Sequence, residues 1–126
     1  MRLGIAKYDR RWRKLDMEIR SKLWIEIDNK PAFGRGRRFL LEAINTYGSI
    51  NQAAKKINIP YRRAWSYINN MEERLGIKLV ERQVGGRYGG GATLTKEARE
   101  FITKYEALEK GIRELVDDRF KKIFGI

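Results

Sequence analysis

The chain has 126 residues, 42% of them hydrophobic, which is enough for one compact domain with an appendage and too few for two full domains. Its formal net charge is +12 and its isoelectric point is about 10.2, which favours a polyanionic partner. The absence of cysteine and histidine excludes disulfides, Cys/His zinc sites and catalysis by either side chain. We therefore expect no cofactor, no metal site and no enzymatic activity.

The positive charge is unevenly distributed along the chain. Residues 1–94 hold 20 Lys or Arg against 9 Asp or Glu, whereas residues 95–126 hold 8 against 7. Solubility alone explains many basic chains, but an excess confined to one segment favours nucleic acid. The sequence contains no signal peptide and no apolar run near the roughly 18 residues of a membrane-spanning helix. We expect a cytoplasmic protein with no membrane contact.

The first 20 residues form an N-terminal basic extension that also contains aromatic side chains. It either packs as a helix or serves as a basic arm, and packing is the simpler role. The next eight residues alternate, with Leu23, Ile25 and Ile27 on one side, which predicts a strand of about five or six residues. Because a single strand is not stable alone, this strand needs a partner later in the chain.

Residues 35–47 follow a helical pattern that Gly48 ends. The predicted apolar stripe consists of Phe39, Leu40, Ala43, Ile44 and Tyr47. Arg35, Arg37 and Arg38 lie in the first turn, where positive charge opposes the helix dipole unless an anion is near. These arginines are either phosphate contacts or a solvated basic turn.

Residues 49–76 predict a helix-turn-helix. Ser49 is a good N-cap for a short helix, and Ala53 and Ala54 are small enough for a second helix to cross closely. Pro60 begins the second helix, where a missing N–H is tolerated. The buried face of that helix is predicted to consist of Ala64, Ile68, Met71 and Leu75.

The opposite face of the second helix is polar and basic, as expected of a recognition helix. We take the candidate DNA-binding residues of this segment to be Ser49, Tyr61, Arg62, Arg63, Ser66, Asn69 and Asn70.

A strand-like segment, residues 77–84, and a second short strand after Gly91 flank a glycine-rich tip. Together they predict a hairpin wing, with the strand around Leu23–Ile27 as its third partner. Glycines permit close approach to a sugar-phosphate backbone or entry into a minor groove, and Arg82 and Arg87 supply charge there. The simpler alternative is a flexible tip.

Thr95 is the predicted N-cap of a C-terminal segment that forms one long helix, or two divided at Gly111. Phe101, Tyr105, Leu108, Ile112 and Leu115 recur at heptad-like spacing. The first half of this seam is expected to pack on its own domain, and the rest to be buried in a homodimer.

The expected fold is mainly α with a small antiparallel sheet (α+β). A winged helix-turn-helix covers residues 21–95, and a C-terminal dimerisation helix covers residues 96–126.

Residues 21 to about 105 resemble the N-terminal winged-helix domain of the molybdate-responsive ModE family, and more distantly LysR-type DNA-binding domains. YRRAW at residues 61–65 and GGRYGGGATLT at residues 85–95 carry the resemblance together. Pro60 departs from the serine usual in relatives. The resemblance implies a DNA-binding dimer, base or phosphate contacts from Tyr61, Arg62, Arg63 and Ser66, and a backbone contact from the wing.

Full regulators of that family continue into small β-barrel domains that bind molybdate, which this sequence does not include. We expect no oxyanion site here; a separate effector-sensing partner is one alternative, and whether any ligand acts stays open. The leading hypothesis is a sequence-specific, dimeric transcriptional regulator bound to double-stranded DNA. Two alternatives remain at this stage, a non-specific architectural DNA-binding protein and a winged-helix protein-interaction module.

Overall fold

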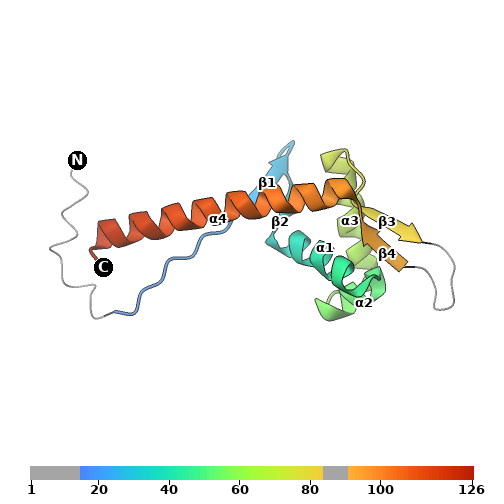
Figure 1. Ribbon diagram of the computed structural model, residues 1–126, viewed down its shortest axis with the longest axis horizontal. Coiled ribbons are helices and arrows are strands. Elements are labelled where there is room, and N and C mark those ends of the chain that lie inside the picture. Colours follow the sequence, from blue (N-terminus) through green and yellow to red (C-terminus); the bar gives the residue numbers. More distant parts are fainter. Residues whose placement is uncertain (1–14, 84–90) are drawn as a thin grey trace. The chain divides into compact units, whose positions relative to one another are not determined.

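A computed structural model describes residues 15–83 and 91–126. The chain divides into two compact units. One unit is Leu23–Lys104, and the other contains residues 15–22 and Tyr105–Ile126. All elements named in the following paragraphs appear in Figure 1.

The element order is β-β-α-α-α-β-β-α. The bounds are β1 Trp24–Ile27, β2 Lys30–Gly34, α1 Arg35–Tyr47, α2 Ile50–Lys56, α3 Tyr61–Leu75, β3 Val80–Gln83, β4 Gly91–Leu94 and α4 Lys96–Phe124. The fold is mainly helical with two small antiparallel hairpins in a winged helix-turn-helix arrangement, which confirms the predicted fold class.

The expected three-stranded wing is wrong. β1 pairs with β2 and not with the wing hairpin, which is a separate two-stranded sheet of β3 and β4. Asp28 and Asn29 both have positive φ, 52° and 64°, as in the tight two-residue turns that match strand twist. The chain therefore reverses at once, and β2 places Ala32 and Phe33 fully in the core.

The helix-turn-helix forms as the sequence predicts. The Ser49 hydroxyl accepts a hydrogen bond from the Gln52 N–H at 3.2 Å and so caps α2. Ala53, Ala54 and Ala64 are buried, so small side chains lie where α2 and α3 pack together. Gly48 and Gly76 end α1 and α3 in the left-handed conformation, with φ of 65° and 68°.

The predicted stripe of α1 is partly wrong. Leu40, Ala43 and Ile44 are buried as expected, but Leu41 is buried too. Phe39 and Tyr47 are exposed, at the margins of the stripe, where cations lie over both rings.

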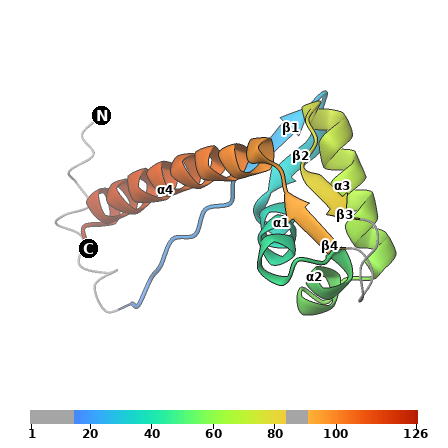
Figure 2. The ribbon, with the colours of Figure 1, turned by 45° about the vertical axis from the view of Figure 1, so that its right-hand side comes forward.

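Backbone hydrogen bonds hold the wing hairpin against the helix-turn-helix (Figure 2). The Ala92 N–H donates to the Gly48 carbonyl at 2.9 Å, and a Cβ at Gly91 would lie only 3.3 Å from that same oxygen. At the wing's base, the Thr95 N–H donates to the Leu79 carbonyl at 2.9 Å. The wing tip, including the predicted contact Arg87, lies outside the described residues.

α4 is one continuous helix, with Gly111 in its interior rather than at a break. The Thr95 hydroxyl accepts a hydrogen bond from the Ala98 N–H at 3.0 Å, which confirms the predicted N-cap. Ala98 and Ile102 are buried, and Phe101 packs edge-on against Phe33 with ring centroids 4.8 Å apart. No helix in the described segments is both long and apolar enough to cross a membrane.

Candidate nucleic-acid interface

Successive residues of α3 are rotated by about 100° around the helix axis, which divides its side chains among four sides. The inward side is buried and contains Ala64, Ile68 and Met71, with Leu75 half-buried. The other three sides are named by what they face: solvent, the wing and the β1–β2 hairpin. The outward face contains Arg62, Ser66 and Asn69, the wing flank contains Tyr61 and Trp65, and the hairpin flank contains Arg63, Tyr67 and Arg74.

The outward face is open to solvent. Arg62, Ser66 and Asn69 are all exposed, while Asn70, between the outward face and the hairpin flank, is half-buried. α3 has no acidic residue in its first turn, and no side chain caps its start at Pro60. Its N-terminal half therefore presents positive charge, amide and hydroxyl groups, and backbone donors on one surface.

The acidic residues of α3 all lie in its second half. Glu72 is engaged by the backbone of the wing. Its Oε2 accepts hydrogen bonds from the Leu79 N–H at 2.7 Å and the Val80 N–H at 3.2 Å. Glu73 is exposed near the C-terminal end of the outward face. On the outward face, a polyanion is therefore favoured at the N-terminal half of α3 and repelled near Glu73.

Among the predicted site residues, Ser49 has a structural task, because its hydroxyl caps α2. Ser49 is half-buried and its hydroxyl is already engaged in this cap, so its main role is in the structure of α2.

The wing flank joins Tyr61, Trp65 and Arg82 in a row. The Tyr61 and Trp65 rings meet edge-to-face with centroids 6.2 Å apart. Arg82, on β3, places its guanidinium carbon 4.5 Å from the centroid of the Trp65 ring. Stacking fixes this guanidinium beside α3 while its N–H groups remain able to bind an anion.

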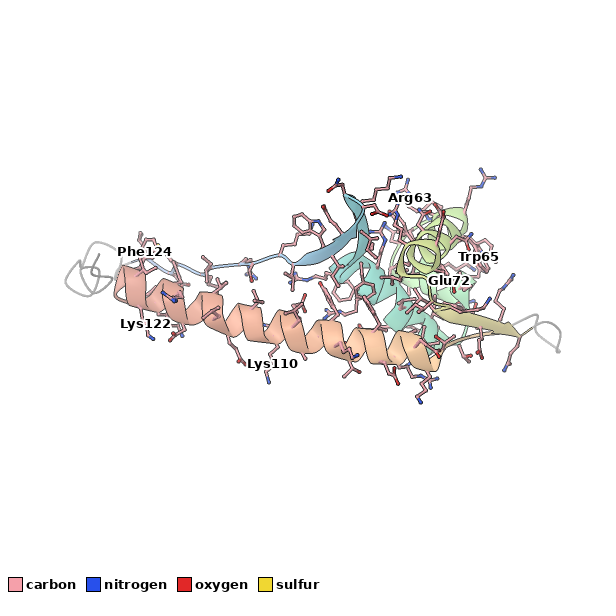
Figure 3. All side chains as sticks on the ribbon, turned by 90° about the horizontal axis from the view of Figure 1, so that it is seen from above. Arg63, Trp65, Glu72, Lys110, Lys122 and Phe124 are labelled. Atoms are coloured by element: carbon pink, nitrogen blue, oxygen red, sulfur yellow. The ribbon has the colours of Figure 1, made fainter. Side chains whose placement is uncertain are left out.

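Trp65 is a further candidate for the site that the sequence prediction did not include. Its spacing of four from Tyr61 signalled a shared helix face, but the contact with Arg82 links two elements distant in sequence. In Figure 3, α3 is seen nearly end-on, and Trp65 and Arg63 lie on different sides of it.

The hairpin flank carries a second basic cluster. Arg37, on α1, places its guanidinium carbon 5.1 Å from the centroid of the Tyr67 ring. Arg74 donates a hydrogen bond to the Pro31 carbonyl on β2. Burial, and next the positive charge of Arg74, lower the pKa of Arg37 from its ordinary value.

The described residues contain no group of three or more His, Cys, Asp or Glu side chains placed to hold a metal ion.

Residues 39–99 match the family described as bacterial regulatory helix-turn-helix protein, lysR family. The chain is 42% identical over 106 residues to the transcriptional regulator ModE of Yersinia pestis, which is 81% of this chain and 40% of that protein. It is 37% identical over 106 residues to the DNA-binding transcriptional dual regulator ModE of Escherichia coli K12, with the same coverage. It is 36% identical over 108 residues to the molybdenum transport protein ModE of Azotobacter vinelandii, 83% of this chain and 40% of that protein.

These similarities confirm the predicted resemblance to ModE over most of the chain and to LysR-type domains over residues 39–99. The match is to transcriptional regulators and not to enzymes, as expected. The chain spans about 40% of the length of these curated relatives.

A double-mutant cycle on Trp65→Leu and Arg82→Ala tests the stacked pair. We expect a coupling free energy of about 0.5–1 kcal/mol in urea unfolding, the range for an exposed cation–π contact. A control cycle of Trp65→Leu with Arg62→Ala should be additive, since Arg62 lies on the outward face. Additivity in both cycles would show that the ring does not hold Arg82.

Proposed function

Because this chain carries a LysR-type helix-turn-helix DNA-binding domain of the ModE family, we propose that it is a sequence-specific transcriptional regulator that binds double-stranded DNA as a dimer. The observation that carries the proposal is the exposed outward face of α3, where Arg62, Ser66 and Asn69 are free of packing roles. We infer a cytoplasmic location, because the proposed regulator acts on DNA.

Sequence recognition in this proposal is the task of the outward face. A guanidinium binds the O6 and N7 edge of guanine with two hydrogen bonds, and an amide does the same for adenine. Arg62 supplies the first group and Asn69 the second, while Ser66 adds a hydroxyl between them. Each good bidentate contact discriminates against a wrong base by about 1–3 kcal/mol.

Affinity in this proposal comes mainly from phosphate contacts, which release counterions from the DNA. Arg63 is the first residue of the hairpin flank of α3, and Arg82 lies over Trp65 on the wing flank. The wing formed by β3 and β4 follows the backbone or enters the minor groove, where Arg87, predicted from the sequence, adds positive charge. The candidate site residues Tyr61 and Asn70 border the outward face and complete the contact surface.

A non-specific architectural protein would need only the positive charge of this surface to bind DNA. The amide and hydroxyl groups between the charged flanks favour base readout over that alternative. In a protein-interaction module the basic face would be solvated and would not bind DNA. Absence of DNA binding in the experiment below would favour this alternative.

The dimer in this proposal forms along α4. Leu108, Ile112 and Leu115 are 48%, 36% and 54% exposed and follow one another at spacings of four and three. An apolar stripe of this period is typical of a helix that packs against another helix. A second copy of α4 presents the same stripe, so the pair buries it by symmetry and places two recognition helices on one duplex.

DNA binding is tested by selecting bound sequences from random duplexes and titrating the selected and scrambled duplexes at several salt concentrations. We expect tighter binding of the selected duplex at every salt concentration. The Arg62→Ala/Arg63→Ala protein should lose both affinity and preference, because it lacks one base contact and one phosphate contact. Equal affinity of wild type for both duplexes would reject sequence specificity, and unaltered binding by the double variant would reject this face.

The same titration with added molybdate or tungstate examines the alternative of a separate effector-sensing partner. We expect oxyanion alone to leave the affinity of this chain unchanged, which is the result if sensing belongs to a separate partner. A shift in affinity on adding the oxyanion would show that this chain senses it directly.

Dimerisation is tested with Leu115→Glu, which places a charge in the exposed stripe. We expect sedimentation velocity to show a dimer for the wild type and a monomer for this variant, because burying an unpaired carboxylate opposes association. Glu114→Gln, one residue away and outside the stripe, should remain dimeric. A monomeric wild type at tens of micromolar concentration would contradict the proposed interface.

A further inference from the structure

Arg37 is held in an environment that does not suit an isolated cation. It is half-buried, and its Nε atom is buried without a hydrogen-bond partner. No carboxylate within the described residues pairs with it, and its ring contact is with Tyr67. The positive charge that lowers its pKa, after burial, is another guanidinium, that of Arg74.

Two guanidinium groups that lie close together away from water destabilise each other and lose hydration. The lowered pKa of Arg37 expresses both effects, burial first and the charge of Arg74 second. A buried donor without a partner calls for an explanation, and such a group beside another positive charge is a candidate for a functional site. The plain alternative is that the stem of Arg37 only packs against Tyr67.

The position of the cluster favours the functional explanation. Arg63, Tyr67 and Arg74 follow one another at spacings of four and seven, so they lie on one flank of α3. Arg63 and Trp65 are separated by about 160° around the helix, which places Arg82 and the Arg37 cluster on opposite flanks. Figure 3 shows the labelled Arg63 and Trp65 on different sides of α3.

A recognition helix in a major groove has a backbone on each side. The helix with its side chains is about 10–12 Å across, and the groove is about 12 Å wide. Its two flanks therefore meet the phosphates of both strands. The wing flank has Arg82 for one strand, and the hairpin flank has Arg63, Arg74 and the poised Arg37 for the other.

We propose that Arg37, which α1 places over Tyr67, and Arg74, which donates to the Pro31 carbonyl of the β1–β2 hairpin, form a site for a DNA phosphate on the groove wall opposite the wing. The site rests on the proposed function and adds a contact outside the helix-turn-helix and wing. Planar guanidiniums suit it because each can bind a phosphate with two parallel hydrogen bonds. The phosphate supplies the negative charge that the described protein residues do not.

The experiment measures how the affinity for the selected and scrambled duplexes falls with salt concentration. Arg37→Met keeps the length of the stem and removes the charge, so the slope of log K against log salt should become shallower by about 0.9 for both duplexes. The affinity ratio between the duplexes should stay at the wild-type value, because a phosphate contact carries no base information. Arg37→Lys should restore the slope, and Lys104→Met, on exposed α4, should leave it unchanged.

Thermal unfolding of the free protein separates a binding role from a packing role. Arg37→Met should unfold at a temperature no lower than wild type, since it removes the repulsion from Arg74. If that variant fails to unfold cooperatively, Arg74→Gln is measured instead, with the same loss of slope expected.

A wild-type slope in a folded Arg37→Met or Arg74→Gln protein would overturn the phosphate site. Loss of binding by Arg62→Ala/Arg63→Ala in the same series would then leave the proposed function standing. Wild-type binding by that double variant would instead count against the proposed function itself.

Discussion

The contact on which the recognition surface depends is the carboxylate of Glu72. One oxygen accepts the N–H groups of Leu79 and Val80, at 2.7 and 3.2 Å, and so ties the last turns of α3 to the first residues of β3. Glu72 is itself a residue of the recognition helix, so the wing is attached directly to that helix (Figure 3). Arg82, two residues beyond Val80, lies over Trp65 on the strand whose beginning this attachment helps to fix.

The wing is held from its second strand as well. Ala92 donates to the carbonyl of Gly48 in the turn between α1 and α2, and the close approach at Gly91 leaves no room for a side chain without a shift of backbone. Thr95 then binds the Lys78 carbonyl through its hydroxyl at 2.6 Å and caps α4 with the same oxygen. Helix-turn-helix, wing and the start of α4 are thus joined by short polar contacts around a small core.

Local signals explain what the sequence predicted correctly. The hydroxyls of Ser49 and Thr95 cap helices by accepting a hydrogen bond from the N–H three residues later. Gly48 and Gly76 end helices because glycine adopts the left-handed conformation at the least cost. The second hairpin strand was missed because Pro31 resembles a strand breaker, yet a two-stranded hairpin consists of edge strands that tolerate proline. The exposure of Phe39 was missed because periodicity marks the side of a helix and not where its packing ends.

The candidate site also contains some residues that local sequence patterns predict and others that only the fold brings together. Arg62, Ser66 and Asn69 could be placed on one exposed face from spacing alone. The stack of Arg82 on Trp65 and the meeting of Arg37 with Arg74 could not, since each joins residues from elements that only the fold brings together. Long-range contacts of this kind leave no local pattern in a sequence.

The most direct test of the account is amide hydrogen exchange at Leu79 and Val80 in the wild type, Glu72→Ala and Glu73→Ala. If Glu72 fixes the wing to the recognition helix, loss of its carboxylate removes bonds worth about 1–3 kcal/mol, and both amides should exchange roughly tenfold faster or more. Glu73→Ala, one residue along on the exposed face, should exchange as the wild type does. Unchanged protection of Leu79 and Val80 in Glu72→Ala would contradict the account.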